Sequence, residues 1–225
     1  MNLLAVETST ELCSAALLRD GELFVEEAVA GNTHSRLLLP MLRRLLARAE
    51  RATGDMDAFA FGAGPGSFTG IRIACGIAQG LAFGAGKPVV PVPSLLALAE
   101  QSDEPRVVAA VDARMGEAYL AAYSRRGDGD WDEVIAPRLV DKASLPALPG
   151  GGWAATGSGF ERHDWLREAY GSPARTAGDL PRAGSVVRIA ARRFARGEGI
   201  AAEAAAPLYL RDKVALTTAE RRASP

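Results

Sequence analysis

The sequence predicts an α/β protein built from two lobes of similar topology. A short apolar segment ending in an acid, a polar turn and a second apolar segment occupy residues 3–18, and the same order returns at residues 107–123. Strand-like and helix-like segments alternate between these units, as is typical of α/β architecture. We interpret the repeat as an internal duplication, although two unrelated hairpins would give the same pattern. The polar segment around Asp103 then divides the chain into lobes of residues 1–103 and 104–225.

The composition is that of a globular protein. The 225 residues are 48% hydrophobic and 24% charged, which excludes a mainly disordered chain. A net charge of −1 provides no global basic field for nucleic acid. Cys13 and Cys75 lack the spacing of a metal or redox motif, so reduced, buried thiols are expected. The N-terminus does not resemble a signal peptide and no long apolar run predicts a membrane span, so we expect a cytoplasmic protein.

The first lobe is predicted to begin with a three-stranded meander, with strands at residues 3–6, 13–18 and 23–29. Its first turn carries Glu7, Thr8 and Ser9, and Asp112 ends the equivalent strand of the second unit. In one interpretation these acids hold a metal–nucleotide between the two lobes. In the other they are turn residues whose side chains bond the local backbone.

An amphipathic helix is predicted over residues 35–51, with Asn32 or Thr33 as its cap. Its apolar residues follow the i, i+3, i+4 spacing of one helix face, whereas Leu37 and Leu39 lie outside that stripe. The apolar surface is therefore wider than one core contact requires. The neighbouring His34 is expected to cap the helix or to pack rather than to bind a ligand.

A glycine-rich loop, residues 62–70, joins a buried strand to a helix that begins at Phe68 with Ser67 as its cap. Backbone amides at such a junction suit a phosphate or carboxylate. The loop lacks the Lys-Ser/Thr of a phosphate-binding loop and the frame of a nucleophile elbow. The alternative is that its glycines allow a sharp turn and close helix packing.

The helix after this loop contains further glycines, Gly76 and Gly80 among them. Each interior glycine costs ~1 kcal/mol relative to alanine, so their number suggests that something packs close to the helix backbone.

The remaining segments complete the alternation. Strands are predicted at residues 89–92, 107–111 and 117–123, and helices at 94–100 and 185–196. Residues 124–132 and 146–158 are polar or rich in glycine and proline, which predicts surface connections. His163, between Arg162 and Asp164, is expected on the surface, and the residues from Ala219 onward are expected to fray.

Five segments of the chain resemble the bacterial TsaB family, also called YeaZ. They are residues 3–10, 33–41, 64–73, 111–117 and 207–212, and they occur in order over nearly the whole sequence. The H-S-x-x-L-L-P and G-P-G-S-F-T-G-x-R motifs are the most specific of them. The chain departs from the family at Glu7, where Asp is frequent, which weakens a metal-binding role for this position.

The resemblance implies an actin-like, Hsp70-like two-lobed fold of the ribonuclease H-like class, with mixed sheets flanked by helices. It also implies a role in forming threonylcarbamoyladenosine at position 37 of tRNAs that read codons starting with A. In that pathway the family is similar to the transferase TsaD in its first lobe and supports TsaD as a non-catalytic partner. The small ATPase TsaE joins the pair, and we expect tRNA to be contacted only indirectly.

Residues of this chain favour the non-catalytic interpretation. The TsaD relatives carry an H-x-x-x-H metal motif just after the strand that follows their glycine-loop helix. The corresponding stretch here is Ser94 to Leu98, and a leucine offers no donor atom to a metal ion. We therefore expect no catalytic residue, no metal ligand and no cofactor.

A scaffold of this kind requires an interface. We predict that the helices at residues 34–51 and 68–83 form one apolar face that binds TsaD and, without TsaD, a second copy of the chain. The predicted interface residues are His34, Leu38, Met41, Leu42, Leu45, Phe68, Ile71, Arg72, Ile73 and Ile77. A vestigial anion or nucleotide loop is predicted from Glu7, Thr8, Ser9, Gly64, Gly66 and Ser67.

Two other functions stay open at this point. A small actin-fold metabolite kinase would need an acid that activates a hydroxyl and an adenosine pocket in the second lobe. A peptidase would need metal ligands or a Ser-His-Asp arrangement, and the sequence supports neither.

Overall fold

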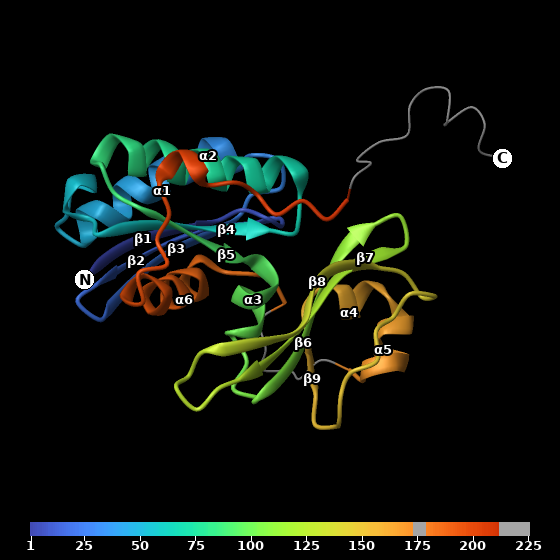
Figure 1. The fold of residues 1–225 in the computed structure, drawn as a ribbon. Coiled ribbons are helices and arrows are strands. Elements are labelled where there is room, and N and C mark those ends of the chain that lie inside the picture. Colours follow the sequence, from blue (N-terminus) through green and yellow to red (C-terminus); the bar gives the residue numbers. More distant parts are fainter. Residues whose placement is uncertain (173–178, 212–225) are drawn as a thin grey trace.

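The computed structural model describes residues 1–172 and 179–211. Two mixed sheets, each with helices packed against it, form two lobes (Figure 1). Asp212, which ends the last segment of the family resemblance, and the tail expected to fray both lie outside the described residues.

The sheet of the first lobe has the strand order β3-β2-β1-β4-β5. The first three strands form the predicted antiparallel meander, and β4 and β5 continue the sheet in parallel to β1. Successive side chains of β1 point to opposite faces, so Leu3 and Ala5 enter one core cluster while Leu4 and Val6 enter another. The strands are β1 (Asn2–Glu7), β2 (Leu12–Arg19), β3 (Glu22–Val29), β4 (Ala58–Gly64) and β5 (Val89–Pro93).

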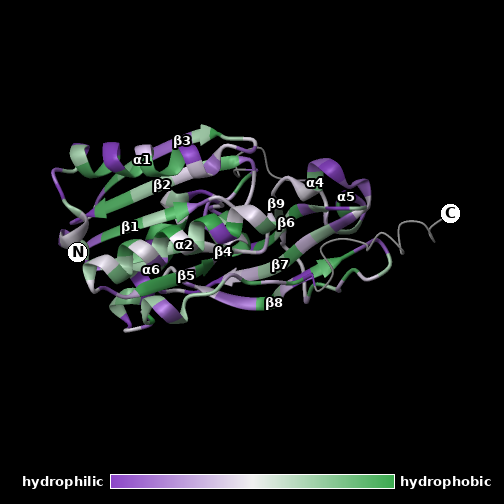
Figure 2. Cartoon of the chain, turned by 90° about the horizontal axis from the view of Figure 1, so that it is seen from above, coloured by the Kyte–Doolittle hydropathy of each residue, from purple (hydrophilic) through white to green (hydrophobic). Residues whose placement is uncertain are grey.

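Helices cover both faces of this sheet. On one face lie α1 (His34–Arg48) and α2 (Phe68–Ala85), which Figure 2 shows from above, with hydrophilic and hydrophobic segments alternating along α1. On the other face lies α6 (Ala183–Ala195), which packs against β1, β2, β4 and β5. The division predicted at residue 103 would assign α6 to the second lobe, whereas its apolar residues pack on the first sheet.

The second lobe repeats the first in its topology. Its strand order is β8-β7-β6-β9, with β6, β7 and β8 antiparallel and β9 parallel to β6, which matches the arrangement of β3-β2-β1-β4. The duplication predicted from the sequence is therefore visible in the sheets. The strands are β6 (Arg106–Arg114), β7 (Glu117–Arg125), β8 (Trp131–Val140) and β9 (Ala154–Thr156), and the helices beside them are α4 (Gly159–Arg162) and α5 (Asp164–Tyr170).

The chain enters the second lobe through a short helix. Helix α3 (Ser94–Ala99) leads from β5 into β6 and is buried throughout, Leu98 included. After α6 the chain passes through a single 3-10 turn, η2 (Ala202–Ala204), beside α2 and returns toward the second lobe. A second 3-10 turn, η1 (Thr53–Asp55), precedes β4.

Candidate functional site

The turn between β1 and β2 packs directly against the glycine-rich loop. A Cβ atom on Gly66 would lie 2.4 Å from the carbonyl oxygen of Ser9, and one on Gly70 would lie 1.9 Å from that of Thr8. The Thr8 hydroxyl also donates to the carbonyl oxygen of Gly70 over 2.7 Å. Only glycine leaves room for the backbone of this turn, so these glycines are explained by packing within the chain.

Three amide groups of the loop donate to acceptors inside the chain. The Ser67 amide donates to the Ser9 carbonyl over 2.7 Å, the Gly70 amide to the Ser67 hydroxyl over 3.3 Å, and the Gly64 amide to the Ser94 hydroxyl over 3.2 Å. An anion that used these three amides would have to compete with these bonds. The packing alternative thus accounts for the loop, and anion binding by it stays a prediction.

The carboxylate of Glu7 is fully buried beneath this loop. One oxygen accepts from the Ser9 amide over 2.6 Å, and the other accepts from the Ser94 hydroxyl over 2.8 Å. A Cβ atom on Gly62 would lie 1.8 Å from the second oxygen, which shows how closely the strand passes. Burial raises the pKa of Glu7 from its usual range, and these hydrogen bonds oppose that rise only in part.

A cleft of about 840 Å³ lies between the two lobes. Its walls are the β1–β2 turn, the start of α2, the β6–β7 turn and residues 208–211. Asp112 lines the cleft, but Glu7 does not, so the structure does not bring the two acids together. The charged side chains that line the cleft are of both signs: Glu11, Asp112, Arg114, Arg162 and Arg211.

His163 contacts Asp112 instead of facing solvent. Its Nε2 lies 3.1 Å from Asp112 Oδ1, its ring packs 4.9 Å from that of Trp165, and only 10% of its side chain is exposed. The expectation of a surface histidine is wrong because the partner carboxylate comes from a strand distant in the sequence. Asp112 also accepts from the Arg114 amide over 3.1 Å, as a turn residue does.

The apolar stripe of α1 packs on the sheet of its own lobe. Leu38, Met41, Leu42 and Leu45 are buried in one core cluster with β1 and β2, and His34 is buried with its Nε2 2.8 Å from the Thr10 carbonyl oxygen. Ile71 of α2 is buried too. These six residues, predicted as interface, are therefore inaccessible to a partner that docks on the folded chain. The i, i+3, i+4 rule finds the face that the chain buries itself.

The outer surfaces of the two helices supply a different apolar surface. Arg44 and Arg48 of α1 pair with Glu26 of β3, and α1 also contacts α2. Leu39 is 45% exposed and Phe83 is 79% exposed. Ile73 and Ile77 of α2 are partly buried and pack against the edge of the core cluster that lies beneath α1 and α2.

Three glycines lie within this surface. No described atom comes within 4 Å of a Cβ placed on Gly76, Gly80 or Gly84. We call the surface formed by Leu39, Ile73, Ile77 and Phe83 with these glycines the α1–α2 face. The sequence signal for Leu39 is its position outside the main apolar stripe of α1.

Phe68 and Arg72, two other predicted interface residues, meet the C-terminal part of the described chain. The Arg72 guanidinium lies 3.5 Å from the centre of the Phe68 ring and donates to the Tyr209 hydroxyl over 2.7 Å. Both residues are exposed, but Arg72 already has partners within its own chain. A partner at this end of α2 would meet a formed cation–aromatic cluster.

Two further properties of the described residues bear on function. Across residues 1–172 and 179–211, no group of three or more His, Cys, Asp or Glu side chains is placed to hold a metal ion. By length and composition, α2 alone among the described helices could cross a membrane, with a mean hydropathy of 1.2. A core helix of a soluble protein meets the same criterion, and Ala74, Ala78 and Ala82 of α2 pack on the sheet.

Comparison with known proteins gives consistent results. The family model of TsaD, tRNA N6-adenosine threonylcarbamoyltransferase, matches residues 27–218. The tRNA threonylcarbamoyladenosine biosynthesis protein TsaB of Escherichia coli is 38% identical over 96% of both chains, and that of Haemophilus influenzae is 38% identical over 95% of both. A solved structure of YeaZ from Pseudomonas aeruginosa is 39% identical, has a TM-score of 0.82, and the match covers 93% of this chain and 99% of that one.

Proposed function

The chain belongs to the TsaB family, and we propose that it serves tRNA threonylcarbamoyladenosine formation as a non-catalytic partner of the transferase TsaD. The observation that carries this proposal is the 38% identity to Escherichia coli TsaB across 96% of both chains. The YeaZ structure, with its TM-score of 0.82, supports the same assignment at the level of the fold.

The state of Glu7 supports a non-catalytic role. An acid that acts on a substrate or a metal ion must present its oxygens to the cleft. Both oxygens of Glu7 instead accept hydrogen bonds from Ser9 and Ser94 in the interior. A metabolite kinase would need an acid in the cleft to activate a hydroxyl group, and Glu7 cannot supply it; Asp112, which does line the cleft, already contacts His163 and the Arg114 amide.

The α1–α2 face is the surface that we assign to TsaD. Its Leu39 and Phe83 are exposed, and burying a leucine or phenylalanine contributes about 1.5–3 kcal/mol. A few such residues supply most of the energy of an interface. The glycines between them permit a second helix to approach closely. Without TsaD, the same face pairs with a second copy around a two-fold axis.

The other partners follow from the same proposal. The ATPase TsaE joins the pair, and this chain contacts tRNA only indirectly. The net charge of −1 agrees with an indirect contact to tRNA. The proposed role in tRNA modification also implies a cytoplasmic location.

Reconstitution tests this function. Purified TsaD, TsaE, a source of threonylcarbamoyl-adenylate and unmodified tRNA are incubated with and without this protein, and modified adenosine is measured by mass spectrometry of nucleosides. We expect modification only when the protein is present and none when TsaD is omitted. Equal modification without the protein would contradict the proposal.

A further inference from the structure

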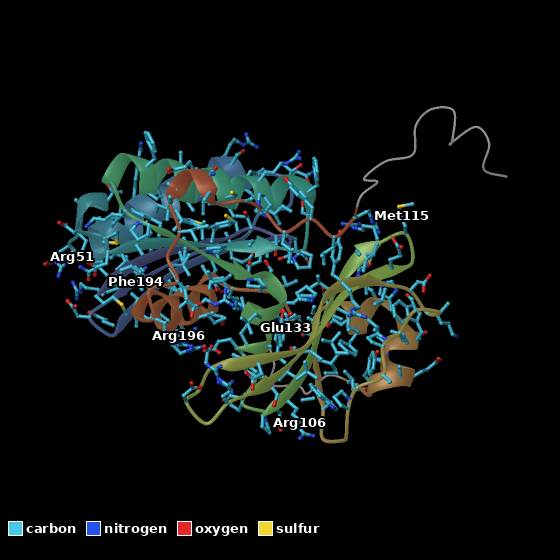
Figure 3. All side chains as sticks on the ribbon, in the orientation of Figure 1. Arg51, Arg106, Met115, Glu133, Phe194 and Arg196 are labelled. Carbon is cyan, nitrogen blue, oxygen red and sulfur yellow. The ribbon has the colours of Figure 1, made fainter. Side chains whose placement is uncertain are left out.

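Strand β7 of the second lobe makes ionic contacts at both of its ends that connect it to the first lobe. At its first residue, Glu117, the carboxylate pairs with the guanidinium of Arg211. Arg211 also lies 3.7 Å from the sulfur of Met115 at the tip of the β6–β7 turn, which Figure 3 shows at one extreme of the second lobe. Arg211 belongs to a segment that runs from α6 back across the first lobe.

This segment, residues 202–211, is fixed to the first lobe along its length, and we call it the strap. The side-chain amide of Gln79 donates to the carbonyl oxygens of Ala202 and Ala205 over 3.1 and 2.9 Å. The Leu208 amide donates to the Ala63 carbonyl over 2.7 Å, and Tyr209 is held by Arg72. Through Arg211 and the strap, Glu117 is therefore connected to α2 and β4.

The other end of β7 meets the first lobe through a buried ion pair. Glu100, at the end of α3, has only 6% of its side chain exposed, and its two oxygens accept from the two terminal nitrogens of Arg192 over 2.9 and 3.0 Å. Arg192 lies on α6, which packs on the first sheet. The indole nitrogen of Trp131, in the second lobe, donates to the same carboxylate over 2.6 Å.

A second acid strengthens this contact. Asp130, in the turn between β7 and β8, lies 2.7 Å from Arg196 and 3.6 Å from Arg192. Figure 3 shows Arg196 at the C-terminal end of α6, near this hairpin. Arg125, the last residue of β7, lies 3.9 Å from Glu100. We call these groups the clasp: Glu100, Arg125, Asp130, Trp131, Arg192 and Arg196. Breaking such a buried charge pair leaves an uncompensated charge, so the clasp resists separation.

The positions of the strap and the clasp limit how the two lobes can move relative to each other. The nine residues of β7 span roughly 30 Å. A hinge rotation that moves one end of this strand away from the first lobe must stretch or break the contacts at that end. We propose that the strap and the clasp hold the lobes in one fixed orientation, so that the chain acts as a rigid body and does not close its cleft over a ligand.

Distance measurements between two spin labels test this inference, which does not depend on the proposed function. The labels are attached at Ala52→Cys in the first lobe and Lys142→Cys in the second, both exposed positions. Cys13 and Cys75 are buried, and burial raises the pKa of the Cys13 thiol to about 11, so neither reacts readily. We expect one narrow distance distribution, unchanged by a saturating concentration of Mg²⁺-ATP.

Two sets of variants test the clasp and the strap separately. The double variant Glu100→Gln with Arg192→Met removes the charge pair and keeps an acceptor for Trp131, and Glu117→Gln weakens the strap at a partly exposed site. We expect the width of the distance distribution at least to double when all three changes are combined. Arg188→Met, at an exposed position of α6, is the matched control and should leave the width unchanged.

Circular dichroism first establishes which variants are folded, and Glu117→Gln carries the test if the double variant is not. In that case we expect Glu117→Gln alone to broaden the distribution. A broad or ligand-dependent distribution in the unmodified chain would overturn the inference, and so would folded variants whose distributions stay as narrow as that of the control.

Discussion

Two groups of glycines with the same four-residue spacing have opposite surroundings. In the first group, Gly62, Gly66 and Gly70, a Cβ atom would collide with Glu7, Ser9 or Thr8. In the second, Gly76, Gly80 and Gly84, a Cβ atom would meet open space in the part of the chain that the structure describes. The first group makes room for the chain's own turn. The second leaves room that this chain does not fill, and we attribute it to a partner.

The largest effect is expected at Gly70. The substitution Gly70→Ala places a methyl group against the Thr8 carbonyl oxygen, where neither backbone segment can move freely. We expect the free energy of unfolding to fall by about 2–3 kcal/mol, as it does when a packed core is overfilled. Urea denaturation measures the change. A loss below about 1 kcal/mol would mean that the turn adapts, and the contrast between the two groups would not hold.

The next largest effect concerns the α1–α2 face. The substitution Phe83→Asp puts a charge where 79% of the side chain is exposed, so the lone chain should keep its stability. We expect self-association to weaken at least about tenfold, because an interface charge must be desolvated without a partner. Sedimentation equilibrium measures the dimer. A dimer as stable as that of the unmodified chain would exclude Phe83 from the interface.

The pH dependence of stability tests the burial of Glu7, which packs against Gly62 of the first glycine group. Because burial raises the pKa of Glu7, the folded state holds this proton more tightly than the unfolded state. The contribution of Glu7 to stability is therefore greatest below the usual pKa of a glutamate and declines as the pH rises toward its folded pKa. The variant Glu7→Gln lacks this titration.

Urea denaturation of both proteins over a pH series isolates the contribution of Glu7. We expect the free energy of unfolding of the unmodified chain, minus that of Glu7→Gln, to decrease as the pH rises from acid toward neutral. A difference that stays constant or increases would contradict a buried carboxylate with a raised pKa.

The smallest effect is expected at Gly80. In the lone chain, Gly80→Ala should raise the free energy of unfolding by about 0.5–1 kcal/mol, because alanine favours the helix and no described atom obstructs its methyl group. Thermal denaturation at a protein concentration that favours the monomer detects this gain. A loss of stability would show that the position is crowded after all.

The sequence predicts the first lobe better than the second for identifiable reasons. Strands β1 to β3 and helices α1 and α2 have clear periodicity and a recognisable cap at Ser67, whose hydroxyl accepts from the Gly70 amide. Strand β8 is an edge strand with many exposed residues, and β9 has only three residues, so neither has a distinct pattern. The predicted loops at residues 124–132 and 146–158 therefore contain parts of strands.

The candidate site shows what local patterns cannot supply. The apolar stripe of α1 identifies a helix but not which surface the chain leaves uncovered, so it predicts the buried Leu38 as an interface residue and omits the exposed Leu39. The contact of His163 with Asp112 joins residues 51 positions apart and has no local signal. The glycines of the two groups look alike in the sequence, because their roles depend on the turn at Thr8 and Ser9.

The most direct test of the docking surface is the affinity for TsaD of two matched variants. Leu39→Asp alters the α1–α2 face at a residue that is 45% exposed, and Val29→Asp alters a residue that is 79% exposed at the end of β3, outside that face. Isothermal titration calorimetry with purified TsaD measures both. We expect Leu39→Asp to lose at least about tenfold in affinity while Val29→Asp binds like the unmodified chain. Equal affinities of the two variants would contradict the assignment of this face to TsaD.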